Sequence, residues 1–163
     1  DGQKADYSEY AAALSEMAAQ LVEDGIDKVA SGSEEGVRLV VKALISSGVA
    51  MSIAGTSRPA SGGEHKFSHW LDANSDNPAL HGEQCGLGSI VTMYLHGGDW
   101  EKIRDTLKVV NAPINAKGLG MDDGMVLSAF INSKEIRPQR TTILDKSTQT
   151  QIEEAALTTG VIG

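Results

Sequence analysis

Residues 82–96 read GEQCGLGSIVTMYLH, a segment with a single charged residue. Apolar residues occupy nearly every side of a helix drawn through it, which predicts a buried helix at the centre of the domain. Gly86 and Gly88 would each cost about 1 kcal/mol relative to alanine in an exposed helix, so another backbone or a ligand is expected to pack closely there. His96 precedes two glycines and is predicted to cap the end of this helix.

Amphipathic periodicity and capping residues predict further helices on both sides of this segment. Residues 49–54 are ambiguous between a short strand and a buried helix, with the helix favoured, and residues 141–144 favour β-structure. The sequence therefore predicts one all-α, multi-helix domain over residues 1–163, with about seven to nine helices. The further predicted helices span residues 7–23, 33–48, 62–72, 99–110, 121–132 and 149–158.

Composition excludes several classes of function. The net charge of −8 and the absence of a basic patch argue against nucleic-acid binding. No uninterrupted apolar run reaches 18 residues, so no membrane insertion is predicted. The single cysteine, Cys85, cannot form an internal disulfide and is interpreted as a buried thiol of a cytoplasmic protein. The polar start at Asp1, without methionine, suggests a piece of a longer polypeptide.

Common nucleotide-binding and hydrolase motifs are absent. There is no G-x-x-x-x-G-K-[ST] phosphate loop and no G-x-S-x-G elbow. Residues 118–124 carry three glycines, but their spacing is wrong for a dinucleotide fingerprint and they follow a predicted helix. If the protein performs nucleotide-linked chemistry, another part of the polypeptide must bind the nucleotide.

Three of the four histidines, His65, His69 and His81, fall within seventeen positions. His65 and His69 are four residues apart, so both project from one helix face about 6 Å apart. His81 precedes the central apolar helix. Imidazole is the commonest protein ligand of zinc, and a site without cysteines that leaves one coordination position open is typical of a catalytic metal.

Residues 49–65, VAMSIAGTSRPASGGEH, together with FSH at 67–69 and LHGEQ at 80–84, closely resemble archaeal sn-glycerol-1-phosphate dehydrogenases. This family belongs to the iron/zinc polyol dehydrogenase superfamily, with glycerol dehydrogenase and dehydroquinate synthase. The resemblance runs over nearly the whole chain and includes residues 9–18, 37–55, 93–108 and 136–144. It implies that the chain is the carboxy-terminal helical half of a two-domain enzyme whose amino-terminal nucleotide-binding domain is absent here.

The resemblance also implies an activity and a set of site residues. The family reduces dihydroxyacetone phosphate to sn-glycerol 1-phosphate with NAD(H) or NADP(H), for archaeal-type membrane phospholipid synthesis. Its Zn²⁺ is held by one Asp and two His. His65 and His81 match the two histidine ligands, and His69 matches the substrate-contacting, catalytic histidine. The Asp ligand is expected upstream of Asp1. A site in which His69 also binds the metal remains an alternative.

The chemistry agrees with these roles. Zinc would polarise the ketone, and His69 would supply or orient the proton. The substrate phosphate is assigned to Ser57, Arg58 and Ser61, with the amides of Gly62 and Gly63, although Arg58 could equally pair with a surface carboxylate. No cofactor-binding residue is expected on this chain, and homo-oligomerisation is possible. The alternatives are a related zinc-dependent polyol dehydrogenase, such as glycerol dehydrogenase, and a non-catalytic helical fragment.

Overall fold

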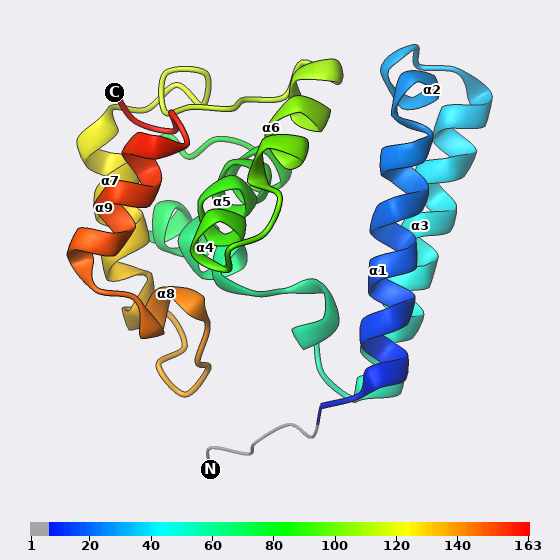
Figure 1. Cartoon of the computed structure of the whole chain (residues 1–163), viewed down its shortest axis with the longest axis horizontal. Helices are drawn as coiled ribbons and strands as arrows, with labels where there is room; N and C mark the ends of the chain where they lie inside the picture. The colour runs from blue at the N-terminus through cyan, green and yellow to red at the C-terminus, as the bar shows by residue number, and fades with distance from the viewer. Residues whose placement is uncertain (1–6) are drawn as a thin grey trace. The chain divides into compact units, whose positions relative to one another are not determined.

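The computed structural model describes residues 7–163 (Figure 1). These residues form nine α-helices and two short 3-10 helices and contain no strand, so the all-α prediction is confirmed. The chain divides into two compact units, one ending at Ser61 and the other spanning Gly62–Gly163. Each unit is described by itself, and the prediction of a single domain stays a prediction.

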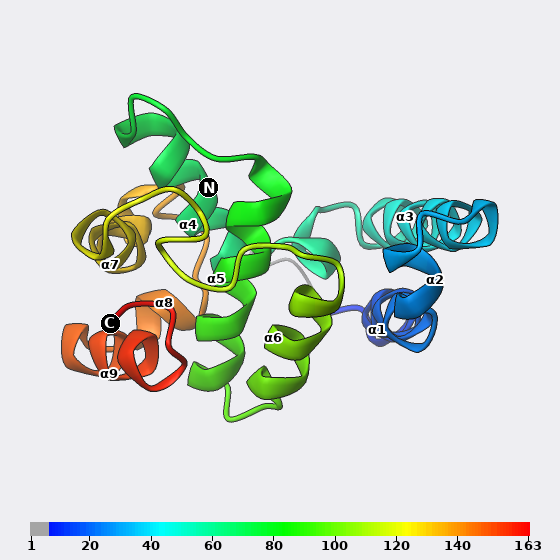
Figure 2. The ribbon, with the colours of Figure 1, turned by 90° about the horizontal axis from the view of Figure 1, so that it is seen from above.

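The first unit is a helical hairpin. Helix α1 (Glu9–Asp24) lies beside the longer α3 (Glu34–Ala54), and the short α2 (Ile26–Ala30) sits at the turn between them (Figures 1 and 2). The hydroxyl of Ser8 accepts a hydrogen bond from a backbone N–H in the first turn of α1. Ser33 caps α3 in the same way, as the sequence predicts.

Helix α3 differs in two respects from its prediction. It continues through Gly48 to Ala54, so the predicted end at Gly48 and the alternative strand are both wrong. Gly48 has open space around it, and nothing there stops the helix. The predicted burial of residues 49–54 is also mostly wrong, because only Ala50 of that stretch is buried. The helix ends at Gly55, which adopts a left-handed conformation with φ 62°.

Helix α3 is also long and apolar enough to span a membrane, judged by length and composition. This helix contains no uninterrupted apolar run of 18 residues, because Arg38 and Lys42 interrupt it. Core helices of soluble proteins meet the same test. The absence of membrane insertion therefore stays a prediction.

The second unit is built around α5 (His81–Leu95), which packs against four neighbouring helices (Figure 2). The central position predicted for this segment is confirmed, and His96 is its C-cap residue, as predicted. The helices around α5 and beside them are α4 (Gly63–Asn74), α6 (Trp100–Val109), α7 (Asp123–Asn132), α8 (Ile143–Lys146) and α9 (Gln149–Thr158).

The glycines of α5 allow two close contacts. A Cβ atom added to Gly88 would lie 3.0 Å from the Cα of Glu64 on α4, and one added to Gly86 would lie 3.1 Å from the Leu107 side chain. The predicted close approach of another backbone is therefore confirmed at Gly88. It brings the start of α4 directly against α5.

Helix α8 replaces the β-structure predicted for residues 141–144, and that prediction is wrong. The backbone N–H of Thr142 donates to Asp145 Oδ2 at 2.7 Å and closes the first turn. The ammonium of Lys66, which is only 2% exposed, donates to Asp145 Oδ1 at 2.7 Å and to the Arg140 carbonyl at 3.1 Å. These polar contacts outweigh the β-propensity of Thr141 and Thr142 and hold α8 against α4.

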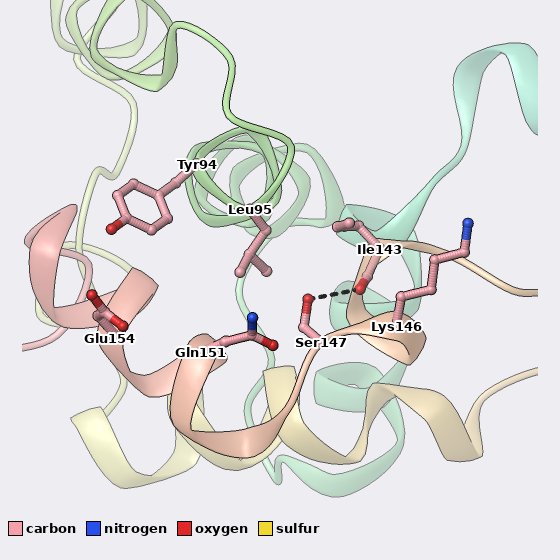
Figure 3. A pocket seen from close by; sticks show the side chains of 7 residues that line it. All are labelled: Tyr94, Leu95, Ile143, Lys146, Ser147, Gln151 and Glu154. Atoms are coloured by element: carbon pink, nitrogen blue, oxygen red, sulfur yellow. Dashed lines mark hydrogen bonds between the residues drawn. The ribbon is translucent and has the colours of Figure 1, made fainter.

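A pocket of about 330 Å³ lies at the carboxyl end of α5, between that helix and α8 and α9 (Figure 3). Its lining residues are Tyr94, Leu95, Ile143, Lys146, Ser147, Gln151 and Glu154. None of them is a predicted site residue. Tyr94 is thirteen positions from His81, so the pocket lies roughly 20 Å along α5 from the histidines.

Candidate metal and substrate site

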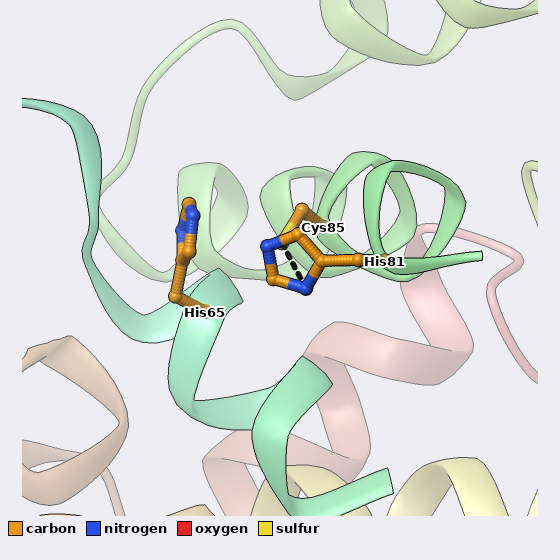
Figure 4. Close-up of side chains that lie close together, drawn as sticks. All are labelled: His65, His81 and Cys85. Carbon is orange, nitrogen blue, oxygen red and sulfur yellow. Dashed lines mark hydrogen bonds between the residues drawn. The ribbon is translucent and has the colours of Figure 1, made fainter. Parts of the chain in front are cut away.

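The three clustered histidines come together where the amino-terminal part of α4 meets the start of α5. The ring centroid of His81 lies 5.1 Å from that of His65 and 5.6 Å from that of His69. The His65 and His69 rings, one turn apart on α4, are separated by 6.4 Å. The sequence spacing therefore correctly predicts that His65 and His69 project from one face of a helix about 6 Å apart. Figure 4 shows His65 of α4 facing His81 and Cys85 of α5.

His65 is oriented by the carboxylate that precedes it. Its Nδ1 lies 2.8 Å from Glu64 Oε1, which also accepts the Gly62 N–H at 2.7 Å. Burial raises the pKa of Glu64, but the hydrogen bonds from His65 and Gly62 outweigh this effect and lower it. Since the Glu64 carboxylate is ionised, it fixes the proton of His65 on Nδ1 and leaves Nε2 as the nitrogen for a metal.

The pKa of free His65 is raised to about 9, by Cys85 first and by Glu64 next, against the opposing effect of partial burial. The imidazole is therefore protonated at neutral pH in the metal-free chain. A metal ion at Nε2 must displace that proton, so binding releases it to solvent.

His81 is oriented by a buried chain of hydrogen bonds. The amide nitrogen of Gln84 donates to the Ala79 carbonyl at 2.9 Å, and this identifies the Gln84 oxygen as the acceptor of the Ser68 hydroxyl proton at 2.5 Å. With its only proton committed, Ser68 Oγ must accept from His81 Nδ1, 2.8 Å away. The Nε2 atom of His81 is again left for a metal.

Cys85 lies one turn after His81 on α5. Its Sγ atom is 3.5 Å from His81 Nε2 and 4.0 Å from the Glu64 carbonyl oxygen. The thiol is half-buried, so the prediction of a buried thiol is wrong. The helical spacing turns the side chain toward the two imidazoles instead of into the core.

Two sets of three donors among the described residues could hold a metal ion. In the first, one ligand atom each of His65, His81 and Cys85 lie within 4.8 Å of one another, and in the second the same holds for His69, Asp72 and His81. Neither set contains all three histidines. The geometry therefore places His65 and His69 in different sets, each of which includes His81.

His69 has a different electrostatic environment from His65. Burial first, and then the positive charge of Arg137, lower the pKa of His69. Its Nδ1 is 3.8 Å from a carboxylate oxygen of Asp72. A neutral imidazole beside the metal pair is able to accept a proton at neutral pH.

The three residues assigned to the phosphate belong to the other unit of the chain. Ser57 precedes the 3-10 helix Arg58–Ala60, and Ser61 follows it. Arg58 is exposed. The Gly62 amide, which the sequence analysis also offers to the phosphate, already donates to Glu64. The assignment of the phosphate to Ser57, Arg58 and Ser61 stays a prediction.

Sequence reasoning missed the residues that orient His65 and His81, namely Glu64, Ser68 and Gln84. A signal for Ser68 and Gln84 was present, because both are polar residues at positions that helical periodicity assigns to a buried face. Cys85 also carried a signal in its spacing of four from His81.

Comparison with curated proteins agrees with the family resemblance. The chain is 61% identical over 142 residues to the glycerol-1-phosphate dehydrogenase [NAD(P)+] of Methanococcoides burtonii, covering 87% of this chain and 40% of that protein. It is 58% identical over 158 residues to the enzyme of the same name from Thermococcus sibiricus, covering 96% and 45%. The predicted resemblance to glycerol-1-phosphate dehydrogenases is thereby confirmed. No family profile matches the chain.

The chain spans less than half the length of the glycerol-1-phosphate dehydrogenases that it matches. The match therefore extends over most of this chain but only part of each dehydrogenase. The all-helical structure of residues 7–163 describes that matched part.

Proposed function

We propose that this chain is the metal- and substrate-binding helical part of an NAD(P)-dependent sn-glycerol-1-phosphate dehydrogenase. The reaction is reduction of dihydroxyacetone phosphate to sn-glycerol 1-phosphate, as a step in archaeal-type membrane phospholipid synthesis in the cytoplasm. The observation that carries the proposal is the pairing of His65 with His81, each with Nδ1 held by a separate acceptor. The names of the similar proteins supply the substrate and the nicotinamide cofactor.

The donor chemistry of the site fits zinc. The Nδ1 atoms of the two imidazoles contact a carboxylate and a serine hydroxyl, which leaves both Nε2 atoms for a metal, and a carboxylate is a usual hydrogen-bond partner of zinc-binding histidines. When bound, zinc supplies Lewis-acid polarisation of the substrate ketone without changing its own oxidation state. His65 and His81 would hold the ion through Nε2, because Nδ1 of each ring is engaged by its own partner.

His69 is assigned the proton transfer. In the reductive direction it delivers a proton to the substrate oxygen as hydride reaches the carbon, and in the oxidative direction it accepts the hydroxyl proton. The lowered pKa of His69 keeps the imidazole neutral at neutral pH, which suits the accepting role. Its Nε2 atom is the proton carrier, because Nδ1 faces Asp72.

The phosphate-binding residues are assigned from the chemistry of the loop at residues 57–61, and the nucleotide-binding domain is assigned from the family resemblance. Ser57, Arg58 and Ser61 bind the substrate phosphate, and NAD(H) or NADP(H) is bound mainly by an amino-terminal nucleotide-binding domain of the same polypeptide. The third metal ligand of the family, an Asp, is expected from that part of the protein. A requirement for the phosphate group in substrate tests distinguishes this activity from glycerol oxidation.

Two substitutions in the full-length enzyme test the histidine roles. His81→Ala is expected to lose zinc and activity while keeping its helical circular dichroism, whereas His69→Ala is expected to keep zinc and lose turnover. His96→Ala, at the far end of α5, is the matched control and should change neither. Full zinc content with normal turnover in His81→Ala would refute the ligand assignment. Equal zinc loss in the His69 and His81 variants would favour the three-histidine site.

A further inference from the structure

We propose that Arg137 binds the phosphate group of the substrate and thereby selects phosphorylated three-carbon ketones over neutral ones. This inference deepens the proposed function and rests on it. A three-carbon phosphate ester is short, so a group that holds its phosphate must lie close to the histidines that act on its oxygen. Arg137 belongs to the same compact unit as the three histidines, whereas Ser57, Arg58 and Ser61 belong to the other unit.

Arg137 lies in a turn that is anchored to α4. Its carbonyl accepts the backbone N–H of Arg140 at 2.8 Å, and the Arg140 carbonyl accepts the ammonium of Lys66 at 3.1 Å. Lys66 lies on α4 between the two histidines of that helix. The 3-10 helix η2 (Ser133–Glu135), which precedes the turn, also packs against α4. The turn is therefore held beside the segment of α4 that contributes to the site.

The charge of Arg137 acts on the histidine assigned to the substrate. Of the charges that act on His69, that of Arg137 is the strongest, and after burial it is the main cause of the lowered pKa of this imidazole. The Arg137 side chain is exposed, and within residues 7–163 its guanidinium has no ion-pair partner. The ammonium of Lys66, in contrast, is buried and paired with Asp145. Arg137 is thus a cation that an anion can reach from solvent.

The backbone of Arg137 is also unusual. Its φ of 50° is left-handed, although the residue has a side chain and precedes Pro138, a position that favours extended backbone. Asn111, the other described residue of this kind, is of a type that adopts the left-handed conformation readily. Strained backbone of this sort persists where the surrounding contacts enforce it, and it is concentrated at ligand-binding sites.

The chemistry of the site requires a cation of this kind. The carboxylates of Glu64 and Asp72 lie beside His65 and His69, and they repel a phosphate dianion. A guanidinium counters that repulsion and donates two parallel N–H bonds to two phosphate oxygens. A neutral ketone such as dihydroxyacetone gains nothing from the same group, so Arg137 discriminates between the two substrates.

Steady-state kinetics of the full-length enzyme with dihydroxyacetone phosphate and with dihydroxyacetone test the assignment. Arg137→Gln should lower kcat/KM for the phosphorylated substrate by roughly 10- to 100-fold and leave kcat/KM for dihydroxyacetone unchanged. Arg137→Lys should recover part of the loss, because an ammonium keeps the charge but not the paired donors. Lys134→Gln removes an exposed cation three positions earlier and is the matched control, which should change neither value.

Inorganic phosphate gives a second measurement. It should compete with dihydroxyacetone phosphate in the wild type and inhibit Arg137→Gln roughly 10-fold or more weakly. Arg137→Gly guards against misfolding, because glycine adopts the left-handed backbone without strain, and it should show the same losses. Zinc content and helical circular dichroism should be unchanged in both variants.

The possible results separate this inference from the proposed function. A wild-type enzyme that prefers the phosphorylated substrate, with the preference intact in Arg137→Gln and Arg137→Gly, would overturn the role of Arg137 and leave the proposed function standing. An equal loss in Lys134→Gln would also overturn it, since the effect would then be a general one of charge. A wild-type enzyme that does not distinguish the two ketones would overturn the proposed function, and the role of Arg137 with it.

Discussion

Replacing Gly88 with alanine tests how the packing of two helices sets the metal site. The new methyl group would lie 3.0 Å from the Cα and 3.1 Å from the Cβ of Glu64, and 3.1 Å from Phe67 Cδ1. Two of these three atoms cannot rotate away, so α4 and α5 must separate by a few tenths of an ångström. Overpacking of this kind costs about 1–3 kcal/mol. Alanine in a helix offsets up to about 1 kcal/mol of that cost.

Gly82→Ala is the matched control, because it lies on the same helix with open space around its Cβ position. It should gain the helix propensity without the collision, so the two variants should differ in unfolding free energy by about 1–3 kcal/mol. Both tryptophans, Trp70 and Trp100, belong to the second unit, and their fluorescence in a urea titration reports on that unit. A difference of 1 kcal/mol corresponds to about 4–8 °C in the melting temperature of a unit of this size. Equal stabilisation by the two alanines would refute the close-packing argument.

Other variants test the remaining contacts. Lys66→Met should cost about 1–3 kcal/mol, because it removes the hydrogen bonds of the Lys66 ammonium to Asp145 and to the Arg140 carbonyl, and urea unfolding measures the loss. Burial raises the pKa of Asp145, but hydrogen bonds from Lys66 and Thr142 outweigh it and lower the pKa. This stabilisation should therefore be complete above the ordinary value of about 3.9 and be lost as pH falls through the lowered pKa of the folded chain, and Lys66→Met should make that acid loss smaller. Gln84→Leu should weaken zinc binding by roughly 10- to 100-fold, since Ser68 would be free to turn its proton toward His81, and competition with a chelator measures the change. The 163-residue chain alone should show a helical spectrum and a cooperative melt but no NAD(P)H-dependent reduction of dihydroxyacetone phosphate, and turnover by this chain would contradict the assignment of the nucleotide to another domain.

Elements with strong local signals were predicted well. The apolar run of α5, the Asp99 cap of α6 and the capped start of α9 all lie where the periodicity and capping rules put them. Errors arose where the local sequence does not decide the local structure. The end of α3 could not be read from Gly48, because a glycine in open space does not by itself stop a helix. Helix α8 depends on Lys66, which is 79 positions from Asp145 along the chain.

The clustering of the three histidines was easier to predict than the residues that orient them. Helical spacing alone brings His65 and His69 to one face, and His81 is marked by its place before the apolar run. The tautomers depend on side chains from both helices, because Ser68 of α4 meets His81 and Gln84 of α5. No spacing rule relates residues on different helices, so this network could be found only once the packing of α4 on α5 was known.

The segment His65-Lys66-Phe67-Ser68-His69 shows why the site and the core cannot be separated. The three middle side chains are buried, while the two histidines that flank them remain partly exposed. Lys66 is tied to α8, Phe67 stacks on Phe130 of α7 at 4.0 Å between ring centroids, and Ser68 bonds to α5. Each residue of a helix is turned by about 100° from the one before, so these three contacts fix the rotation of α4 about its axis. That rotation directs both flanking imidazoles toward His81. A change that lets α4 rotate by one residue would therefore bury a histidine and expose the lysine, and it would destroy the metal site and the core together.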